Sequence, residues 1–284
     1  MGWVRLSSIP GQKVDSREYV FNYWKIADGS VWHQKRRLKN ADPASFEVRK
    51  DYSQVFIARD INHIFHGWSL VPKIDRNTFR EVGNGYWIDR HRAYCEHETS
   101  ITPLKGEDVS HFKYIGGPYA RDSVFAYYAG RVMKTCIEPL KLQLMDHENV
   151  WYAGDKKKIF HDGAEIAGVD FESWTLIKGG FSKDKKAVYF GSKPLPRVKL
   201  ESWEQLGGTY SRDQLSVYQM YFKIIGADPR SWECLSHNYS RDANAVYYGS
   251  RVIPDADSRT FRLTGEGRAK DQNRSYIRGE SQHA

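Results

Sequence analysis

The sequence predicts an all-β protein built as a tandem array of about eight β-meander repeats, each of 29 residues. Three observations predict this class: an aspartate that recurs at a fixed spacing, an aromatic residue five positions after each aspartate, and short strand-like runs that end in Gly-Ser turns. Self-similarity at such a period is typical of repeat architectures. We expect each meander to stack on its neighbours, because one unit alone cannot bury both faces of its aromatic residues.

The recurring aspartates set the phase of the array, with successive gaps of 29, 33, 33, 29, 29, 29 and 29 residues. They are Asp60, Asp89, Asp122, Asp155, Asp184, Asp213, Asp242 and Asp271. The aromatic residues that follow are Phe65, Tyr94, Tyr127, Phe160, Tyr189, Tyr218, Tyr247 and Tyr276. A degenerate first unit is predicted to begin near Asp28, and the last unit ends soon after Tyr276.

Each unit is predicted to hold a three-stranded meander. The run after the aspartate, such as Val-Tyr-Tyr at 246–248, is short and rich in β-branched and aromatic residues, which is typical of a strand. A second strand follows the Gly-Ser turn, as at 251–253. A third carries a Trp or Phe and a Leu, such as Trp203 and Leu206, and ends at the aromatic residue three positions before the next aspartate. Propeller-like closure is the alternative, although 29 residues are few for a four-stranded blade.

The aspartates are expected to close turns rather than to carry chemistry. Asp and Ser side chains accept hydrogen bonds from backbone N–H groups one or two residues further on. The Ser-x-Asp pattern with a following aromatic residue is Asp-box-like, although it lacks the glycine two positions after the aspartate. Eight copies of one turn make a fold, whereas eight copies of one catalytic acid have no evident use. We therefore interpret these aspartates as structural.

The repeats also define the domain organisation. Residues 1–27 are predicted to be an N-terminal segment and residues 28–284 the repeat region, with a division into two subdomains near 116–150 as an option. Residues 1–20 contain no apolar run long enough for a signal peptide or a membrane span, so a cytoplasmic location is expected. The three cysteines, at wide and unrelated spacings, favour reduced thiols over a disulfide framework.

Motifs for catalysis or cofactor binding do not stand out. The sequence has no Gly-rich phosphate loop, no Cys/His metal spacing and no Ser-His-Asp order, so we expect neither enzyme activity nor a metal or cofactor. His63 and His66 are three apart in a strand-like run and should point to opposite faces. A nucleophile at Cys95 between His91 and His97 is conceivable, but an ordinary surface pair is favoured.

The units resemble the DKNYY repeat family of bacterial proteins, most closely at 242–248 (Asp-Ala-Asn-Ala-Val-Tyr-Tyr) and 184–190 (Asp-Lys-Lys-Ala-Val-Tyr-Phe). Some members are similar to immunity proteins of secreted antibacterial toxins, as in type VI secretion. The resemblance implies a cytoplasmic, non-catalytic protein that covers the active surface of a cognate toxin, with a nuclease as the suspected class. The net charge of +8 is compatible with a nucleic-acid or polysaccharide binder. Because this charge is spread along the chain and does not form a patch, such a binder is only the second hypothesis.

The predicted partner surface lies in the two 33-residue units, where four extra residues create locally acidic stretches in a basic protein. Insertions in a repeat array map to loops, often on the binding face. Two solvated loops of drifting sequence are the alternative. The fixed phase of the aromatic residues places them in the core first, and one or two that deviate from it, such as Trp68 or Trp87, are candidates for the surface. The predicted partner-binding residues are Glu96, Glu98, Glu107, Asp108, Glu138, Asp146 and Glu148.

Overall fold

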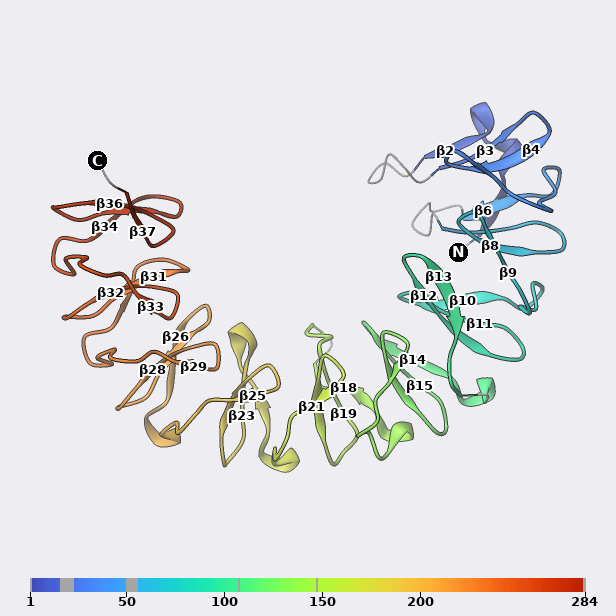
Figure 1. Ribbon diagram of the computed structural model, residues 1–284. Helices are drawn as coiled ribbons and strands as arrows, with labels where there is room; N and C mark the ends of the chain where they lie inside the picture. The colour runs from blue at the N-terminus through green and yellow to red at the C-terminus, as the bar shows by residue number, and fades with distance from the viewer. Residues whose placement is uncertain (1, 16–22, 50–55, 107, 147, 283–284) are drawn as a thin grey trace. The chain divides into compact units, whose positions relative to one another are not determined.

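The computed structural model describes residues 2–15, 23–49, 56–106, 108–146 and 148–282. Its regular structure consists of β-strands and short 3-10 helices, and the strands form small antiparallel sheets that follow one another along the chain (Figure 1). The all-β tandem array is confirmed. The chain divides into two compact units, Met1–Asp155 and Lys156–Ala284. Among the described residues, no helix has the length and apolar character needed to cross a membrane.

Unit 1 contains four complete sheets and one further hairpin, and most strands are three or four residues long. The first sheet is β2 (Lys13–Asp15), β3 (Tyr23–Ala27), β4 (Ser30–His33) and β5 (Arg36–Arg37). The second is β1 (Trp3–Arg5), β6 (Glu47–Arg49), β7 (Ile57–Arg59), β8 (Ile64–His66) and β9 (Ser69–Val71). The third is β10 (Arg80–Gly83), β11 (Tyr86–Ile88), β12 (Ala93–His97) and β13 (Ser100–Pro103). The fourth is β14 (Lys113–Gly116), β15 (Tyr119–Arg121), β16 (Ala126–Tyr128) and β17 (Arg131–Val132), and the hairpin is β18 (Gln143–Leu144) and β19 (Tyr152–Gly154).

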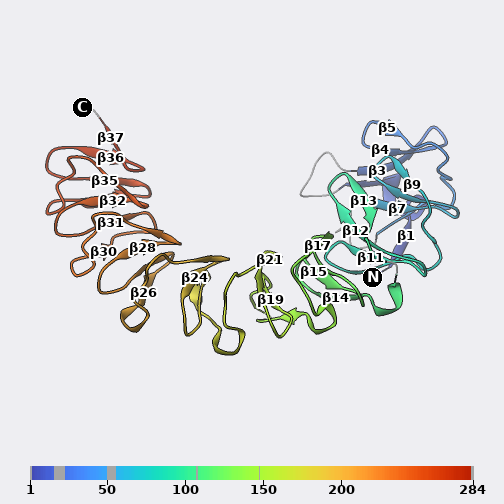
Figure 2. The same ribbon diagram turned by 60° about the horizontal axis from the view of Figure 1, so that its bottom comes forward.

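Unit 2 begins with a hairpin and continues with four complete sheets, which Figure 2 shows following one another along the chain. The hairpin is β20 (Ile159–His161) and β21 (Ala164–Glu165). The first complete sheet is β22 (Thr175–Leu176), β23 (Phe181–Lys183), β24 (Val188–Phe190) and β25 (Lys193–Pro194). The second is β26 (Glu204–Gly207), β27 (Tyr210–Arg212), β28 (Val217–Gln219) and β29 (Phe222–Lys223), and the third is β30 (Glu233–Cys234), β31 (Tyr239–Arg241), β32 (Val246–Tyr248) and β33 (Arg251–Val252). The fourth is β34 (Arg262–Gly265), β35 (Arg268–Lys270), β36 (Ser275–Ile277) and β37 (Glu280–Gln282).

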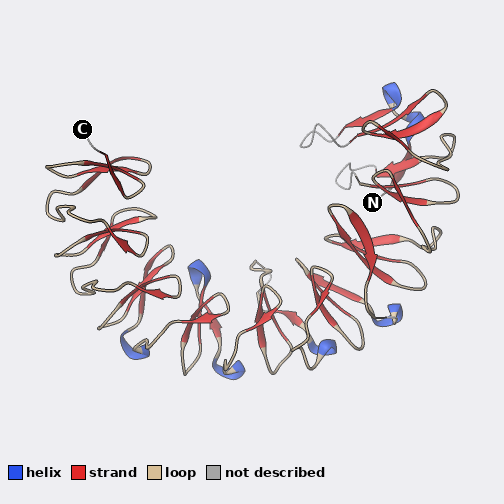
Figure 3. Cartoon of the chain, in the orientation of Figure 1, coloured by secondary structure: helices blue, strands red, loops and turns tan. Residues whose placement is uncertain are grey.

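Short 3-10 helices occupy several of the connections within and between sheets (Figure 3). In unit 1 they are η1 (Leu6–Ser8), η2 (Pro10–Gln12), η3 (Val109–His111) and η4 (Pro139–Lys141). In unit 2 they are η5 (Phe171–Ser173), η6 (Lys178–Gly180) and η7 (Leu200–Ser202).

The repeat contains four strands, so the prediction of a three-stranded meander was wrong. The segment expected to form one strand from Trp203 to Tyr210 is two strands, β26 and β27, paired antiparallel with a bulge between Gln205 and Gly207. Gly207 and Gly208 have φ angles of +136° and +53°, which reverse the chain there. Glycine adopts these angles without steric cost. In the described residues of each unit, every sheet is open, and no barrel or propeller forms.

The first repeat begins earlier than predicted. Val31 occupies the position of Ala93, because Leu38 donates to the Val31 carbonyl as Leu104 donates to that of Ala93. Counting back four residues places Ala27, not Asp28, at the position of the repeat aspartate. Asp28 lies instead in the tight turn between β3 and β4. Strands β1, β2 and β3 therefore lie within the predicted N-terminal segment 1–27, and the observed division follows Asp155 rather than falling in 116–150.

Buried aromatic residues fill the space between successive sheets. In unit 2, Tyr210, Trp232 and Tyr247 form one cluster with Val217 and Ile224. The rings of Trp232 and Tyr247 lie 4.8 Å apart. Burying side chains of this size provides most of the favourable free energy, so each sheet is stabilised by its neighbour.

The recurring aspartate is a buried hydrogen-bond hub in the turn between the second and third strands. At Asp242, Oδ1 accepts from the N–H groups of Asn244 and Ala245 at 2.7 and 2.8 Å. Oδ2 accepts from the Tyr247 hydroxyl and from the backbone N–H of Asp228, both at 2.8 Å. The same carboxylate thus closes a hairpin, orients a buried tyrosine and fixes the preceding connection. The structural interpretation of these aspartates is supported by this geometry.

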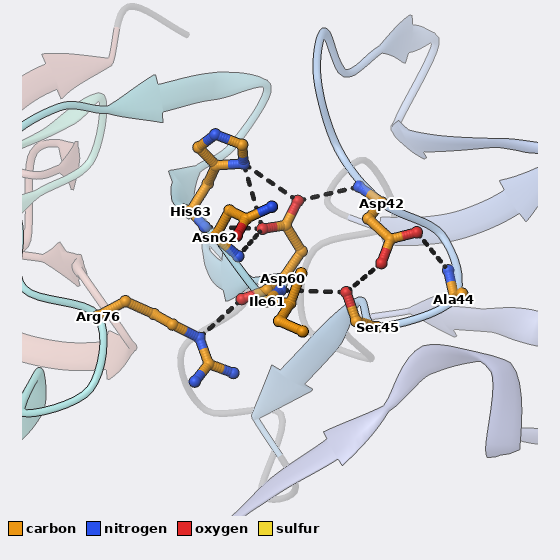
Figure 4. Close-up of polar contacts among 8 residues, drawn as sticks. All are labelled: Asp42, Ala44, Ser45, Asp60, Ile61, Asn62, His63 and Arg76. Atoms are coloured by element: carbon orange, nitrogen blue, oxygen red, sulfur yellow. Dashed lines mark hydrogen bonds and ion pairs between the residues drawn. The ribbon is translucent and has the colours of Figure 1, made fainter.

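The hub around Asp60 lacks the tyrosine hydroxyl that the other hub described above contains, and a histidine lies near the carboxylate there (Figure 4). Phe65 stands where most repeats have tyrosine, and the His63 ring nitrogen lies 3.3 Å from Asp60 Oδ2 instead. Asp42 donates its N–H to the same oxygen at 2.9 Å, and its own carboxylate holds Ser45. The Ser45 hydroxyl in turn accepts from the N–H of Ile61 at 3.0 Å. This network ties the connection after the first sheet to the turn of the second.

Tyrosines of the second strand link neighbouring repeats. Tyr239 donates its hydroxyl hydrogen to the carbonyl of Gly267 at 3.3 Å and accepts from the N–H of Gly279 at 2.9 Å. Tyr86 makes the equivalent pair with Pro118 and Gly130. Each hydroxyl therefore binds two different turns of the next sheet, which fixes the spacing of the array.

Candidate partner-binding site

The turns of each sheet lie at the two ends of its strands, and these two ends have different roles. In a four-stranded antiparallel sheet, the first and third turns lie at one end, which we call the hairpin edge, and the second turn lies at the other end. We call that other end the aspartate edge, because it carries the hub aspartates and the connections between sheets. The hairpin edge of unit 1 is formed by the turns 34–35, 67–68, 84–85, 98–99, 117–118 and 129–130 and by the turn between β18 and β19.

The predicted acidic residues are divided between these edges. Glu98 lies in the turn between β12 and β13, and Asp146 and Glu148 lie in the turn between β18 and β19, all at the hairpin edge. Asp108 and Glu138 precede η3 and η4 at the aspartate edge. Glu107 lies outside the described residues. The sheet of β14–β17 stands between the turns of Glu98 and Glu148, so the structure does not gather the acidic residues in one place.

Several of these carboxylates are already engaged. Glu96 has a side chain only 8% exposed, and it accepts from the Trp87 indole nitrogen at 3.0 Å. Asp108 accepts from Ser110, His111 and Ser123, and the two serine hydroxyls are the first reasons that its pKa lies well below the usual value. Glu138 forms an ion pair with Lys141.

Two exposed acidic residues remain. Glu98 and Glu148 are exposed, and within the described part of the chain neither side chain has an ion pair. Asp146 is partly buried and accepts the N–H of Glu148 at 2.9 Å, which shapes their turn. Glu98 therefore stands out, because it also lines a groove.

The groove has a volume of about 530 Å³ and crosses the third turns of three successive sheets. It is lined by Gln34 from the first sheet, by Phe56, His66, Gly67, Trp68 and Ser69 from the second, and by Glu98 and Thr99 from the third. The β12–β13 hairpin is longer than its equivalents, since Tyr94 and Leu104 are ten residues apart where Tyr218 and Ile224 are six apart. The four residues inserted in this repeat thus form one wall of the groove.

Three residues of the lining, Phe56, His66 and Trp68, carry aromatic rings. Of the two tryptophans named as candidates for the surface, Trp68 is 45% exposed, whereas Trp87 is fully buried. Phe56 stacks on the His66 ring with centroids 5.4 Å apart and an interplanar angle of 16°. Arg36 places its guanidinium 4.2 Å from the centre of the Trp68 ring.

Two buried histidines lie beneath this surface. His33 is fully buried between Trp24, at a centroid distance of 4.5 Å, and Trp68, at 6.1 Å. Among the residues that the structure describes, neither ring nitrogen of His33 has a hydrogen-bond partner. Burial, together with the nearby His66, lowers the pKa of His33 to about 4. His66 Nε2 lies 3.6 Å from the Glu96 carboxylate, which is longer than a hydrogen bond.

Only part of this site was predictable from the sequence. Trp68 carries a visible signal, because it occupies a turn position where several repeats have Gly or Ser, as at Gly130 and Ser250. The roles of His33 and Phe56 depend on stacking between sheets, for which no local pattern exists. A nucleophile at Cys95, which the sequence made conceivable but did not favour, is disfavoured further, because burial raises the pKa of its thiol to about 11. The favoured interpretation of an ordinary surface position is wrong for Cys95, which is buried. Among the described residues, no group of three His, Cys, Asp or Glu side chains is placed to hold a metal ion.

The family assignment follows from the repeats just described. The family model of the DKNYY family matches residues 23–163 and 152–280, which together span nearly all of the sheets. The chain belongs to the DKNYY family. The match begins at Tyr23, the first residue of β3, so this member's repeats include the first sheet. No curated protein and no solved structure matches the chain.

Proposed function

We propose that this DKNYY protein is a non-catalytic binding protein that holds a partner protein in the groove at the hairpin edge of unit 1. The groove carries the proposal, because it presents an exposed tryptophan and an exposed carboxylate on a wall built by an inserted hairpin. Interfaces derive most of their affinity from a few such aromatic anchors in apolar pockets. As the sequence resemblance implied, the partner we propose is a secreted antibacterial toxin, which the protein neutralises in the cytoplasm of the producing cell.

The architecture supports binding rather than chemistry. Neighbouring sheets hold the groove residues on both sides, so the surface is pre-organised and its ordering cost has been met by folding. The charged side chain in the lining is acidic, which disfavours a phosphate backbone as the ligand. A toxin with a basic active surface is compatible with this charge.

Replacing Trp68 by alanine is expected to weaken partner binding by roughly 30-fold, the effect of losing a hot-spot anchor of about 2 kcal/mol. Calorimetric titration with the protein encoded beside this gene measures the change. Because Trp68 is half exposed, the melting temperature should change little. The matched control is Ile61→Ala, an exposed apolar residue at the aspartate edge, which should bind like the wild type. Equal affinities for the two variants would contradict the proposed site.

Charge reversal tests whether the partner binds at the groove or at the acidic turn between β18 and β19. Glu98→Lys is expected to slow association by roughly tenfold at low salt, with the difference shrinking as salt is added, because exposed interface charges act mainly on encounter. Glu148→Lys, at an equally exposed acidic residue of a different turn, should change the rate by less than about twofold. Stopped-flow association at two salt concentrations gives both values. The reverse ranking would place the interface at the β18–β19 turn.

A further inference from the structure

The last sheet of unit 2, formed by β34–β37, has one face that no other described sheet of this unit covers (Figure 1). We call it the outer face. We infer that the outer face binds the phosphate backbone of a single-stranded nucleic acid. This second binding activity is independent of the partner protein proposed for unit 1. Two features carry it: polar side chains in place of a buried apolar row, and cations without counter-charges.

The outer face is polar at positions where the preceding sheet is apolar. In that sheet Tyr239, Val246 and Ile253 are at most 3% exposed, because the last sheet packs against them. The residues 29 positions later are polar and exposed, and they are Arg268, Ser275 and Gln282. A polar terminal face keeps a repeat array soluble, so polarity alone does not indicate a ligand. The charge of the face does.

Two cations oppose each other across the first two strands of the outer face. In the preceding sheet, Glu233 lies opposite Arg241 and forms an ion pair with it at 2.8 Å. The equivalent residues of the last sheet are Arg262 and Lys270, which lie opposite each other and therefore point to the same face. Like charges in such positions destabilise a sheet. A bound anion would remove this repulsion.

A third cation adds to this pair. Arg268 lies two residues before Lys270 in β35, so its side chain points to the same face. In the described part of unit 2, the side chains of Arg262, Arg268 and Lys270 form no ion pair and no hydrogen bond. Glu280 lies two strands away from Arg268, and the Asp271 carboxylate is buried and already accepts four hydrogen bonds in its hub. The outer face therefore has an excess of positive charge.

Phosphate groups match the side chains of this face. Arginine guanidinium groups bind phosphate oxygens in a bidentate manner, and serine and glutamine side chains also bind them frequently. Ser275 and Gln282 continue the row of Arg262 and Lys270, because each of these residues lies opposite the next one. A hollow of about 580 Å³ borders this row at the aspartate edge, and Lys270, Ser275 and Gln282 are part of its lining.

A polymer with a charge on every nucleotide can contact all three cations at once, which a single small anion cannot do. Stacking of bases requires exposed aromatic side chains. Among the described residues of β34–β37, the one aromatic side chain is Tyr276, and it is buried. The contact is therefore to the phosphate backbone, with little dependence on the base sequence.

Fluorescence anisotropy of the full chain with labelled oligo(dT) of about 20 nucleotides tests the proposal. We expect a Kd on the order of 10 µM at low salt. The logarithm of the association constant should fall with the logarithm of the salt concentration with a slope of roughly −2, the value for three phosphate contacts on a single strand. The Arg262→Glu/Arg268→Glu variant should bind at least roughly tenfold more weakly. It should fold, because Arg262→Glu places an acid opposite Lys270, as Glu233 lies opposite Arg241.

The matched control is Lys193→Glu/Lys223→Glu, which changes the net charge by the same amount at two exposed residues of earlier sheets. Its affinity should stay within about twofold of the wild type. Equal losses in the two variants would show that the net charge of the protein, and not the outer face, attracts the strand. Absence of binding to oligo(dT) would overturn the proposal, and so would equally effective displacement of the strand by polyglutamate of the same charge, which would indicate an acidic protein as the ligand.

Discussion

Replacing Asp242 by alanine is expected to lower the free energy of unfolding by roughly 3–5 kcal/mol. A turn held by one hydrogen bond would lose only about 1 kcal/mol. The structure raises it, because the carboxylate accepts four hydrogen bonds, and its loss leaves three backbone N–H groups and the Tyr247 hydroxyl without their acceptor. Urea-induced unfolding followed by circular dichroism measures the change.

Asp255→Asn is the control for this prediction, because Asp255 has a φ of +58° and asparagine, unlike alanine, adopts such an angle readily. Asp255 belongs to the same unit and forms an ion pair with Arg274 at 3.2 Å, but its side chain is 75% exposed. Surface pairs of this kind contribute little, so its loss should cost less than about 1 kcal/mol. Comparable losses in the two variants would refute the hub. Loss of partner binding in Asp242→Ala at unchanged stability would show instead that the aspartate is functional.

Acidification is expected to destabilise unit 1 through His33. Its pKa is lowered by burial, and by the neighbouring His66, from 6.5 to about 4 in the folded protein. Between these values the unfolded chain binds a proton that the folded chain does not, so stability is complete above pH 6.5 and falls as the pH drops toward 4. At pH 5 the loss amounts to roughly 2 kcal/mol.

The His33→Gln variant isolates this contribution. It removes the titrating group from beneath Trp68, so the difference in unfolding free energy between pH 7.5 and pH 5 should shrink by roughly 2 kcal/mol relative to the wild type. Other groups titrate in both proteins and cancel in the comparison. An unchanged pH dependence in the variant would show that His33 does not remain neutral in the folded state.

The repeat was predictable because its signal is local and redundant. The phase of the aspartates, the aromatic residue five positions later and the turn role all depend on neighbours within one hairpin. The number of strands was not predictable, because the Gly207–Gly208 reversal resembles an ordinary end of a strand in sequence. The phase of the first repeat was missed for a related reason: Ala27 replaces the aspartate, and the adjacent Asp28 imitates it.

The site was predictable only as a region. The insertion after Tyr94 indicated a special hairpin, and that hairpin does form a wall of the groove. Which acidic residues reach solvent depends on strand direction and on packing between sheets. Glu96 and Glu98 are two residues apart, yet the first is bound to Trp87 in the interior and the second is exposed. The acidic composition of this stretch does not indicate which of the two carboxylates is exposed.

The position of β1 has a consequence for the order in which the repeats fold. Trp3 in β1 pairs with Arg49 in β6, and the chain between these two strands forms the whole of the first sheet. The complete sheets of unit 2, in contrast, each pair strands from one short stretch of chain. Contacts between distant residues form slowly, because the intervening chain must be ordered first. During synthesis β1 must therefore wait for its partner until β6 has left the ribosome, after the whole of the first sheet has been made, while each sheet of unit 2 can close soon after its own fourth strand emerges.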